Sequence, residues 1–207
     1  MVQRPEVGLS ARGREQARRL ATRLARERGG HVGHVGHVGH ILASDLRRAV
    51  MTAEVLRDAL EVPLALDPGL RERDYGDVRG MAYAELTANI FAPDYAPPGG
   101  ETWETFHARV DAAWERVVAA ARRGPGDLAV VTHGLVCHAI ATRHLDLLPG
   151  TAVGMRWGNA SLTVIEGPGY RAVRVLDCTA HLEAGTDGAQ RHQMAPAARS
   201  SSTNPRG

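Results

Sequence analysis

The sequence has 207 residues, of which 43% are hydrophobic and 23% charged, and its formal net charge at pH 7 is +2. This length and composition are typical of one globular domain with a sizeable core, and the near-neutral charge without a basic run favours neither a nucleic-acid partner nor a membrane-surface partner. All 25 basic residues are arginine, which excludes Schiff-base and P-loop chemistry based on lysine.

The first predicted helix lies within "LSARGREQARRLATRLARERGG". Ser10 can cap its start, and Gly29 and Gly30 follow its end. Four apolar residues fall on one face at helical spacing and are expected to be buried: Ala17, Leu20, Ala21 and Leu24.

A histidine repeat follows in "HVGHVGHVGH", residues 31–40. Its glycines disfavour a helix, and an extended strand would send histidines three apart to opposite faces. Only a polyproline-II-like run would align them along one edge, where Zn²⁺ or Ni²⁺ could bind adventitiously. Because no carboxylate or cysteine completes such a site, we predict a lengthened surface loop and no metal.

Strands and helices alternate after the repeat. The expected elements are a strand in "HILAS", a helix in "DLRRAVMTAEVLRDAL", a strand in "PLALD", a helix near "AYAELTANI", a helix over 102–122, a strand in "DLAVVTHG", a helix in "LVCHAIATRHL" and a hairpin of "SLTVIE" and "YRAVRVL". This order predicts an α/β fold, a three-layer sandwich with a mostly parallel sheet and helices on both faces. In such folds ligands bind beyond the carboxyl ends of strands, which indicates "ILASDLRR" and "VVTHG" as candidate sites.

Single residues in these stretches are weak evidence. His133 ends an apolar strand, and a histidine there is more often a strand-end residue than a catalytic one. Arg48 could form a surface ion pair, and Glu72 in "GLRERDYGDVRG" could be an ordinary loop charge.

Five stretches taken together are more specific. In order, "GLSARGREQA", "ILASDLRRAVMTA", "GLRERDYGDVRG", "PPGGETWETFHARV" and "AVVTHGLVCHAI" resemble sequence blocks of the histidine phosphatase superfamily, the phosphoglycerate-mutase-like enzymes. The resemblance covers most of residues 8–181. It implies an α/β phosphoglycerate-mutase-like fold and transfer of a phosphoryl group through a phosphohistidine, which water then hydrolyses.

The resemblance also implies roles for individual residues. Arg48 matches a phosphate clamp, and His133, with Gly134 beside it, matches the second active-site histidine that donates to the phosphoryl group. Glu72 matches the acid that protonates the leaving oxygen and later activates water. Asn159 and Ser161, in "GNAS", match residues at the edge of the family's pocket, but this resemblance is weaker. The resemblance implies no metal and no cofactor, and the expected partner is a small phosphorylated metabolite.

The family's nucleophile lies in a strand followed by Arg-His-Gly, upstream of the block that "GLSARGREQA" matches. No Arg-His-Gly triplet occurs in the 207 residues. We therefore expect either a truncated chain or a degenerate family member, favour truncation, and expect impaired activity. Because that strand is central in the family's sheet, we expect unpaired edges on both the "ILAS" and the "AVVTHG" strand.

Two other functions stay open beside a phosphatase. One is a non-catalytic phosphate- or ligand-binding remnant, and a weaker one is a histidine-rich metal-binding protein. A phosphoglycerate-mutase-type phosphotransferase is less favoured, because mutases of the family tend to be longer.

The expected organisation is one domain over residues 8–182, followed by a disordered tail over 183–207. Cys137 and Cys178 have no CxxC spacing, and no apolar run has the length of a membrane span or a signal peptide. These features predict a cytoplasmic location. The oligomeric state cannot be read from the sequence.

Overall fold

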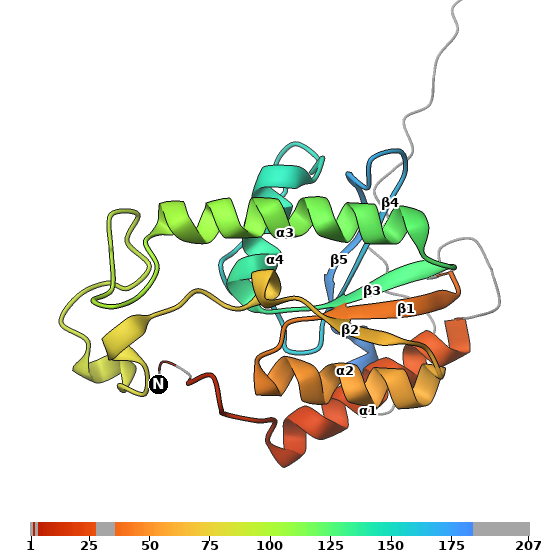
Figure 1. Cartoon of the computed structure of the whole chain (residues 1–207), viewed down its shortest axis with the longest axis horizontal. Coiled ribbons are helices and arrows are strands. Elements are labelled where there is room, and N and C mark those ends of the chain that lie inside the picture. The colour runs from red at the N-terminus through yellow and green to blue at the C-terminus, as the bar shows by residue number, and fades with distance from the viewer. Residues whose placement is uncertain (1, 3, 28–35, 184–207) are drawn as a thin grey trace, which may run out of the picture.

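The computed structural model describes residues 2, 4–27 and 36–183 (Figure 1). Most of the histidine repeat, up to residue 35, and the predicted tail from residue 184 lie outside the described residues. The helices and strands are, in chain order, α1 (Ala11–Arg26), β1 (Val38–Ala43), α2 (Arg47–Leu60), β2 (Leu64–Leu66), α3 (Trp103–Arg123), β3 (Asp127–Val131), α4 (Gly134–His144), β4 (Leu162–Glu166) and β5 (Ala172–Cys178).

The central sheet is parallel, with the strand order β2-β1-β3. Helices α1 and α2 cover one face of it, and α3 and α4 cover the other (Figure 1). Each face has its own apolar core, with Leu20 and Leu56 on one side and Phe106 and Val110 on the other. The predicted three-layer α/β sandwich is confirmed.

Helix α1 shows how local signals set this arrangement. The side chain of Ser10 accepts a hydrogen bond from the backbone N–H of Gly13 at 3.1 Å, as expected of a residue that caps a helix. The buried residues of α1 are the four predicted from helical spacing: Ala17, Leu20, Ala21 and Leu24. They turn one stripe of the helix toward the sheet and α2.

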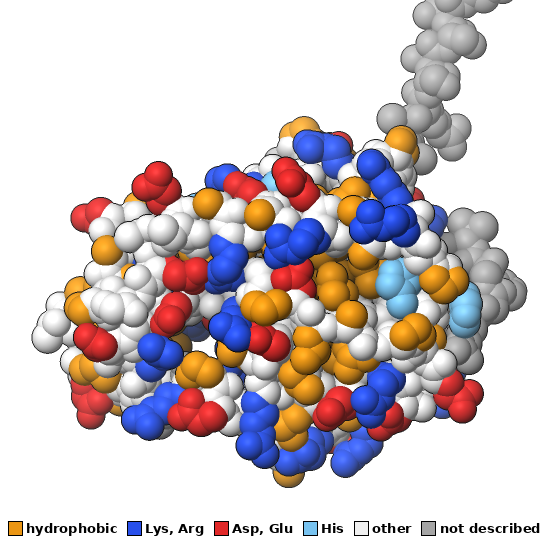
Figure 2. Space-filling model, viewed as in Figure 1, with side chains coloured by type: hydrophobic (Ala, Val, Ile, Leu, Met, Phe, Trp, Pro, Cys, Tyr) orange, Lys and Arg blue, Asp and Glu red, His pale blue; other side chains and the backbone are white. Residues whose placement is uncertain are grey.

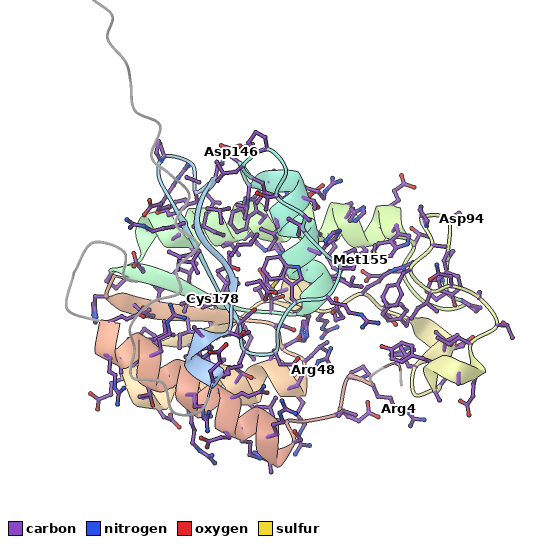
Figure 3. The ribbon with its side chains drawn as sticks, turned by 180° about the vertical axis from the view of Figure 1, so that it is seen from behind. Arg4, Arg48, Asp94, Asp146, Met155 and Cys178 are labelled. Carbon is purple, nitrogen blue, oxygen red and sulfur yellow. The ribbon has the colours of Figure 1, made fainter. Side chains whose placement is uncertain are left out.

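The predicted hairpin forms, but it stands apart from the sheet. Strands β4 and β5 pair antiparallel with each other, and neither hydrogen-bonds to β3. Seen from the front and from behind, the hairpin lies beyond β3, on the side opposite β2 (Figures 1 and 3). Among the described strands, β3 therefore pairs on one edge only.

The expectation of an unpaired "ILAS" strand is wrong. Ile41 in β1 pairs with Leu64 of β2 on one side and with Ala129 of β3 on the other. The two strands that were expected to flank a third strand are direct neighbours, so β1 has both of its edges covered. Of these two strands, only β3 has an edge without a partner among the described strands.

The predicted helix near "AYAELTANI" is also wrong, since this stretch holds only a 3₁₀ turn at Tyr83–Glu85. Glu85 accepts from the N–H of Ala82 at 2.8 Å, a bond typical of a helix start, but the turn does not continue. Farther along, the Asn89 side chain accepts from the N–H of Phe91 at 3.0 Å, and such local bonds compete with helical ones.

The last part of the histidine repeat is not a loop, because β1 begins at Val38. The ring of His40 packs against Gly124, where a side chain would collide with it. Both ring nitrogens are buried without a hydrogen-bond partner in the described part of the chain. Over the same residues, no group of three side chains could hold a metal ion.

Positive and negative side chains are interspersed over the face shown in Figure 2, which carries no broad field of one sign. None of the described helices combines the length and the apolar character that a membrane crossing requires.

Candidate functional site

The carboxyl ends of β1 and β3 bring polar residues together. Ser44 follows β1, and Thr132 and His133 follow β3, which is the adjacent parallel strand. The Nε2 atom of His133 lies 2.8 Å from the hydroxyl oxygen of Ser44, and both residues are buried. The hydroxyl of Thr132 donates to the carbonyl of Leu70 at 2.8 Å and so ties this end of the sheet to the next loop.

Arg48 lies in the first turn of α2 (Figure 3), and its positive charge acts on His133. Its side chain is half-buried, and one terminal guanidinium nitrogen is buried with no hydrogen-bond partner among the described residues. Burial lowers the pKa of Arg48, while the nearby Glu72 carboxylate raises it. Because an arginine stays charged in proteins, this nitrogen is a charged donor without an acceptor, and a bound anion would satisfy it.

Glu72 connects the loop after β2 to the start of α4. One carboxylate oxygen accepts from the N–H of Arg73 at 3.1 Å, and the other accepts from the N–H of Leu135 at 3.3 Å. Burial raises the pKa of Glu72 against the lowering effect of these two bonds and of Arg48 and Arg109. The carboxyl group therefore tends to keep its proton.

His133 is held neutral. Burial, together with the positive charges of Arg48 and Arg109, lowers its pKa to about 3. Arg109, from α3, donates to the backbone carbonyl of Glu72 at 3.4 Å and pairs with the carboxylate of Glu101 at 2.7 Å. The charge of Arg48 thus acts on both Glu72 and His133, which places the three side chains in one cluster.

Two hollows meet at this cluster. The lining of a cavity of about 1060 Å³ includes five predicted site residues: Arg48, His133, Gly134, Asn159 and Ser161. A neighbouring hollow of about 1070 Å³ is lined by Arg48 and Glu72. Arg48 is common to both, so the structure brings all six predicted residues to one region. Asn159 is exposed, as expected of a residue at the edge.

The sequence did not point to Ser44 as a partner of His133. Its position at the end of a predicted strand was a signal, but the adjacency of β1 and β3 was needed to use it. Arg109 was also missed, because helical spacing alone does not tell which loop a long side chain reaches.

Arg73 is a third residue that sequence reasoning missed. It is 2% exposed, and its guanidinium donates to three backbone carbonyls, of Ile90 at 3.2 Å, Tyr95 at 2.6 Å and Glu101 at 3.1 Å. It also lies 3.9 Å from the centre of the Trp103 ring. These contacts fasten the segment over residues 90–103 beside Glu72.

Comparison with known proteins agrees with this architecture. A family model described as the histidine phosphatase superfamily, branch 1, matches residues 1–177. The chain is 32% identical over 137 residues to an uncharacterized phosphatase, PhoE, of Bacillus subtilis, covering 66% of this chain and 64% of the relative. It is 33% identical over 143 residues to a glucosyl-3-phosphoglycerate phosphatase of Mycolicibacterium vanbaalenii, covering 68% and 52%. The chain thus spans less than two thirds of the length of either relative.

A solved structure of a mycobacterial glucosyl-3-phosphoglycerate phosphatase with inorganic phosphate superposes with a TM-score of 0.68 at 27% identity. The match covers 88% of this chain and 93% of that one. The family match over most of the chain, together with this shared fold, shows that the protein belongs to the histidine phosphatase superfamily, branch 1.

Proposed function

We propose that this site hydrolyses a small phosphomonoester through a phosphohistidine intermediate. The single observation that carries the proposal is the buried guanidinium nitrogen of Arg48, which has no hydrogen-bond partner among the described residues, next to a neutral His133. A charged donor facing a concave site is suited to phosphate. The naming of its relatives as phosphatases supports the same class of reaction.

Phosphate would be held from two directions. The planar fork of Arg48 can donate to two phosphoryl oxygens at once. His133, as the neutral imidazole, can donate one further hydrogen bond, and Gly134 stands at the start of α4, where backbone N–H groups point outward. Donors fixed in this way favour the charge that builds up on the equatorial oxygens during transfer.

Glu72 is assigned as the general acid and base. Burial raises its pKa, which favours a carboxyl group that holds a proton and can donate it. The proton passes to the leaving oxygen as the bond between that oxygen and phosphorus breaks and the bond from phosphorus to the carrier histidine forms. The resulting carboxylate then takes a proton from the water that attacks phosphorus and releases the histidine.

The carrier histidine of the family stands in an Arg-His-Gly triplet, which the 207 residues do not contain. In this assignment His133 is the second histidine and not the carrier. These residues alone are therefore expected to bind phosphate and to turn over substrate poorly, because loss of a nucleophile commonly lowers rates by factors on the order of a million.

The substrate is proposed to be a small phosphorylated metabolite. One relative is named for glucosyl-3-phosphoglycerate, which is of this kind. A binding-only remnant is the principal alternative, because it requires Arg48 and His133 but no carrier. A mutase-type phosphotransferase would require a second phosphorylated acceptor in the same cavity.

The test compares the 207-residue chain with a version extended at its N-terminus by a designed apolar strand ending in Arg-His-Gly, using p-nitrophenyl phosphate. We expect turnover only from the extended chain, and its loss in Arg48→Met but not in Arg57→Met. Arg57 is the matched control, because it lies on the same helix and pairs with Asp58 at the surface. Turnover by the 207-residue chain that disappears in His133→Ala would contradict the assignment and imply another nucleophile. An extended chain that folds and binds phosphate without turnover would favour the binding-only remnant.

A further inference from the structure

The hydroxyl group of Ser44 lies between a backbone donor and the ring of His133. Its oxygen accepts a hydrogen bond from the N–H of Leu46 at 3.3 Å and is 2.8 Å from the Nε2 atom of His133. Ser44 is 0% exposed and His133 is 7% exposed, so water does not reach this contact freely. A hydroxyl group has one hydrogen, and a buried hydrogen of this kind requires an acceptor.

The Nε2 atom of His133 is that acceptor. The Ser44 hydroxyl forms no other hydrogen bond with the described residues, and toward Leu46 its oxygen can only accept. If the imidazole carried a proton on Nε2, the hydroxyl oxygen would accept from both sides. Its own hydrogen would then be buried without a partner, which costs free energy. The hydrogen of Ser44 is therefore directed to an Nε2 atom that carries no proton.

The proton of the imidazole must then lie on its other nitrogen. A neutral histidine has one N–H, and the hydrogen bond at one ring nitrogen decides which nitrogen holds it. His133 is neutral, because burial and the charges of Arg48 and Arg109 lower its pKa to about 3. The contact with Ser44 thus selects the form of His133 that is protonated on Nδ1.

The Nδ1 atom of His133 is available to a ligand. His133 precedes the first turn of α4, but its side chain makes no capping hydrogen bond there. Its one side-chain hydrogen bond with the described residues is the bond at Nε2, and Nδ1 is not among the fully buried polar atoms that lack a partner. His133 and Arg48 both line the cavity of about 1060 Å³. A donor on Nδ1 therefore faces the same cavity as the guanidinium group of Arg48.

We propose that Ser44 is a positioning residue, whose hydroxyl keeps the proton of His133 on Nδ1 so that the imidazole donates to a phosphoryl oxygen beside Arg48. This inference rests on the proposed function, which takes phosphate as the ligand. It adds the nitrogen that donates and the residue that selects this nitrogen. Ser44 acts only through His133, because its one hydrogen is used at Nε2.

The other form of His133 would oppose phosphate binding. With the proton on Nε2, a lone pair on Nδ1 would face the phosphoryl oxygens, which are also acceptors. The charge of Arg48 would then have to overcome this repulsion between acceptors. A hydroxyl that fixes the proton on the correct nitrogen prepares the donor before phosphate arrives, and such preparation is how supporting residues strengthen a binding site.

The test locates the proton of His133 directly, by long-range proton–nitrogen NMR correlations in the chain with ¹⁵N-labelled histidine at neutral pH. His133→Gln identifies the signals by their disappearance. We expect the proton on Nδ1 in the unaltered chain and a shift of population toward Nε2–H in Ser44→Ala. Ser44→Thr keeps the hydroxyl and should return the proton to Nδ1. The control is Thr142→Val, which removes an exposed hydroxyl of α4 that donates to the carbonyl of His138 at 2.8 Å and should leave the proton on Nδ1.

Calorimetric titration of the same variants with inorganic phosphate measures the consequence for binding. We expect the dissociation constant to rise about tenfold in Ser44→Ala, as for the loss of one hydrogen bond. Ser44→Thr should recover most of the affinity, and Thr142→Val should bind as the unaltered chain does. A loss of binding that accompanies the shift of the proton, and is recovered with it, separates positioning from a general loosening of the fold.

Three results would overturn the proposal. The first is a proton on Nε2 in the unaltered chain, and the second is an unchanged proton position in Ser44→Ala. The third is a shifted proton with unchanged phosphate affinity, which would overturn the role of Ser44 alone. Absence of phosphate binding by the unaltered chain would overturn the proposed function, and this role with it. If Ser44→Thr does not fold, the unaltered chain and Ser44→Ala still decide between these outcomes.

Discussion

The imidazole of His133 and the hydroxyl of Ser44 are 2.8 Å apart, although 89 residues separate them in the chain. The contact exists because β1 and β3 are adjacent parallel strands that end at the same edge of the sheet. It fixes the ring of His133 toward the first turn of α2, where Arg48 projects. The candidate site therefore depends on the order of the strands.

The first prediction concerns His133 and the stability of the fold at acid pH. Its pKa is about 3 in the folded chain against an ordinary value of 6.5, so between these values the unfolded chain holds a proton that the folded chain does not. The associated stability is present above pH 6.5 and is lost as the pH falls toward 3, by up to about 1.4 kcal/mol per pH unit. Urea unfolding of His133→Gln should show a shallower dependence on pH over this range. Equal slopes for the two proteins would mean that His133 is protonated when folded.

The second prediction concerns Glu72 and has the opposite sign. Its pKa is raised by burial from the ordinary 4.5, so the folded chain holds a proton that the unfolded chain releases. The associated stability is present below pH 4.5 and is lost as the pH rises through the folded pKa. Relative to Glu72→Gln, the unaltered chain should lose free energy of unfolding with rising pH in urea titrations. A constant offset between the two curves would reflect altered hydrogen bonds alone and would contradict a raised pKa.

The fold was predictable where short-range patterns decide it. Helical spacing identified the buried face of α1, and alternating strands with a Gly-Pro-Gly turn identified the β4–β5 hairpin. The turn at Tyr83–Glu85 was not predictable in this way, because the side chain of Asn89 bonds to the local backbone where a helix would have continued. The adjacency of β1 and β3 was missed because strand order is a property of the whole sheet.

The candidate site, like the fold, was predictable in part from local sequence patterns and depended otherwise on contacts between distant residues. The rule that ligands bind at the carboxyl ends of parallel strands was enough to bring Arg48 and His133 together from the sequence. The contacts of Ser44 with His133 and of Arg109 with the carbonyl of Glu72 span long separations and required the structure. No sequence pattern marks Arg73, since all three of its carbonyl partners lie in irregular chain.

The third prediction tests that anchoring role. In Arg73→Lys, an ammonium group cannot reach the three carbonyls that the guanidinium bonds, and two lost bonds from a charged donor cost about 3 kcal/mol or more. We expect this loss in urea unfolding, with faster amide exchange over residues 90–103. Arg79→Lys is the control, because Arg79 is 38% exposed and bonds one carbonyl, that of Gly76. Equal losses in both variants would show that the contacts of Arg73 add nothing specific.

The most direct measurement is a calorimetric titration of the 207-residue chain with inorganic phosphate at low salt. It compares the unaltered chain with Arg48→Met and Arg57→Met. Arg48 holds a buried donor without a partner in the part of the chain that the structure describes, whereas Arg57 is half-exposed and paired with Asp58. A charged hydrogen bond of about 1.5–3 kcal/mol predicts binding about 10- to 100-fold weaker in Arg48→Met, and unchanged binding in Arg57→Met. Equal affinity in all three proteins, or no binding by the unaltered chain, would contradict a phosphate site at Arg48 and His133.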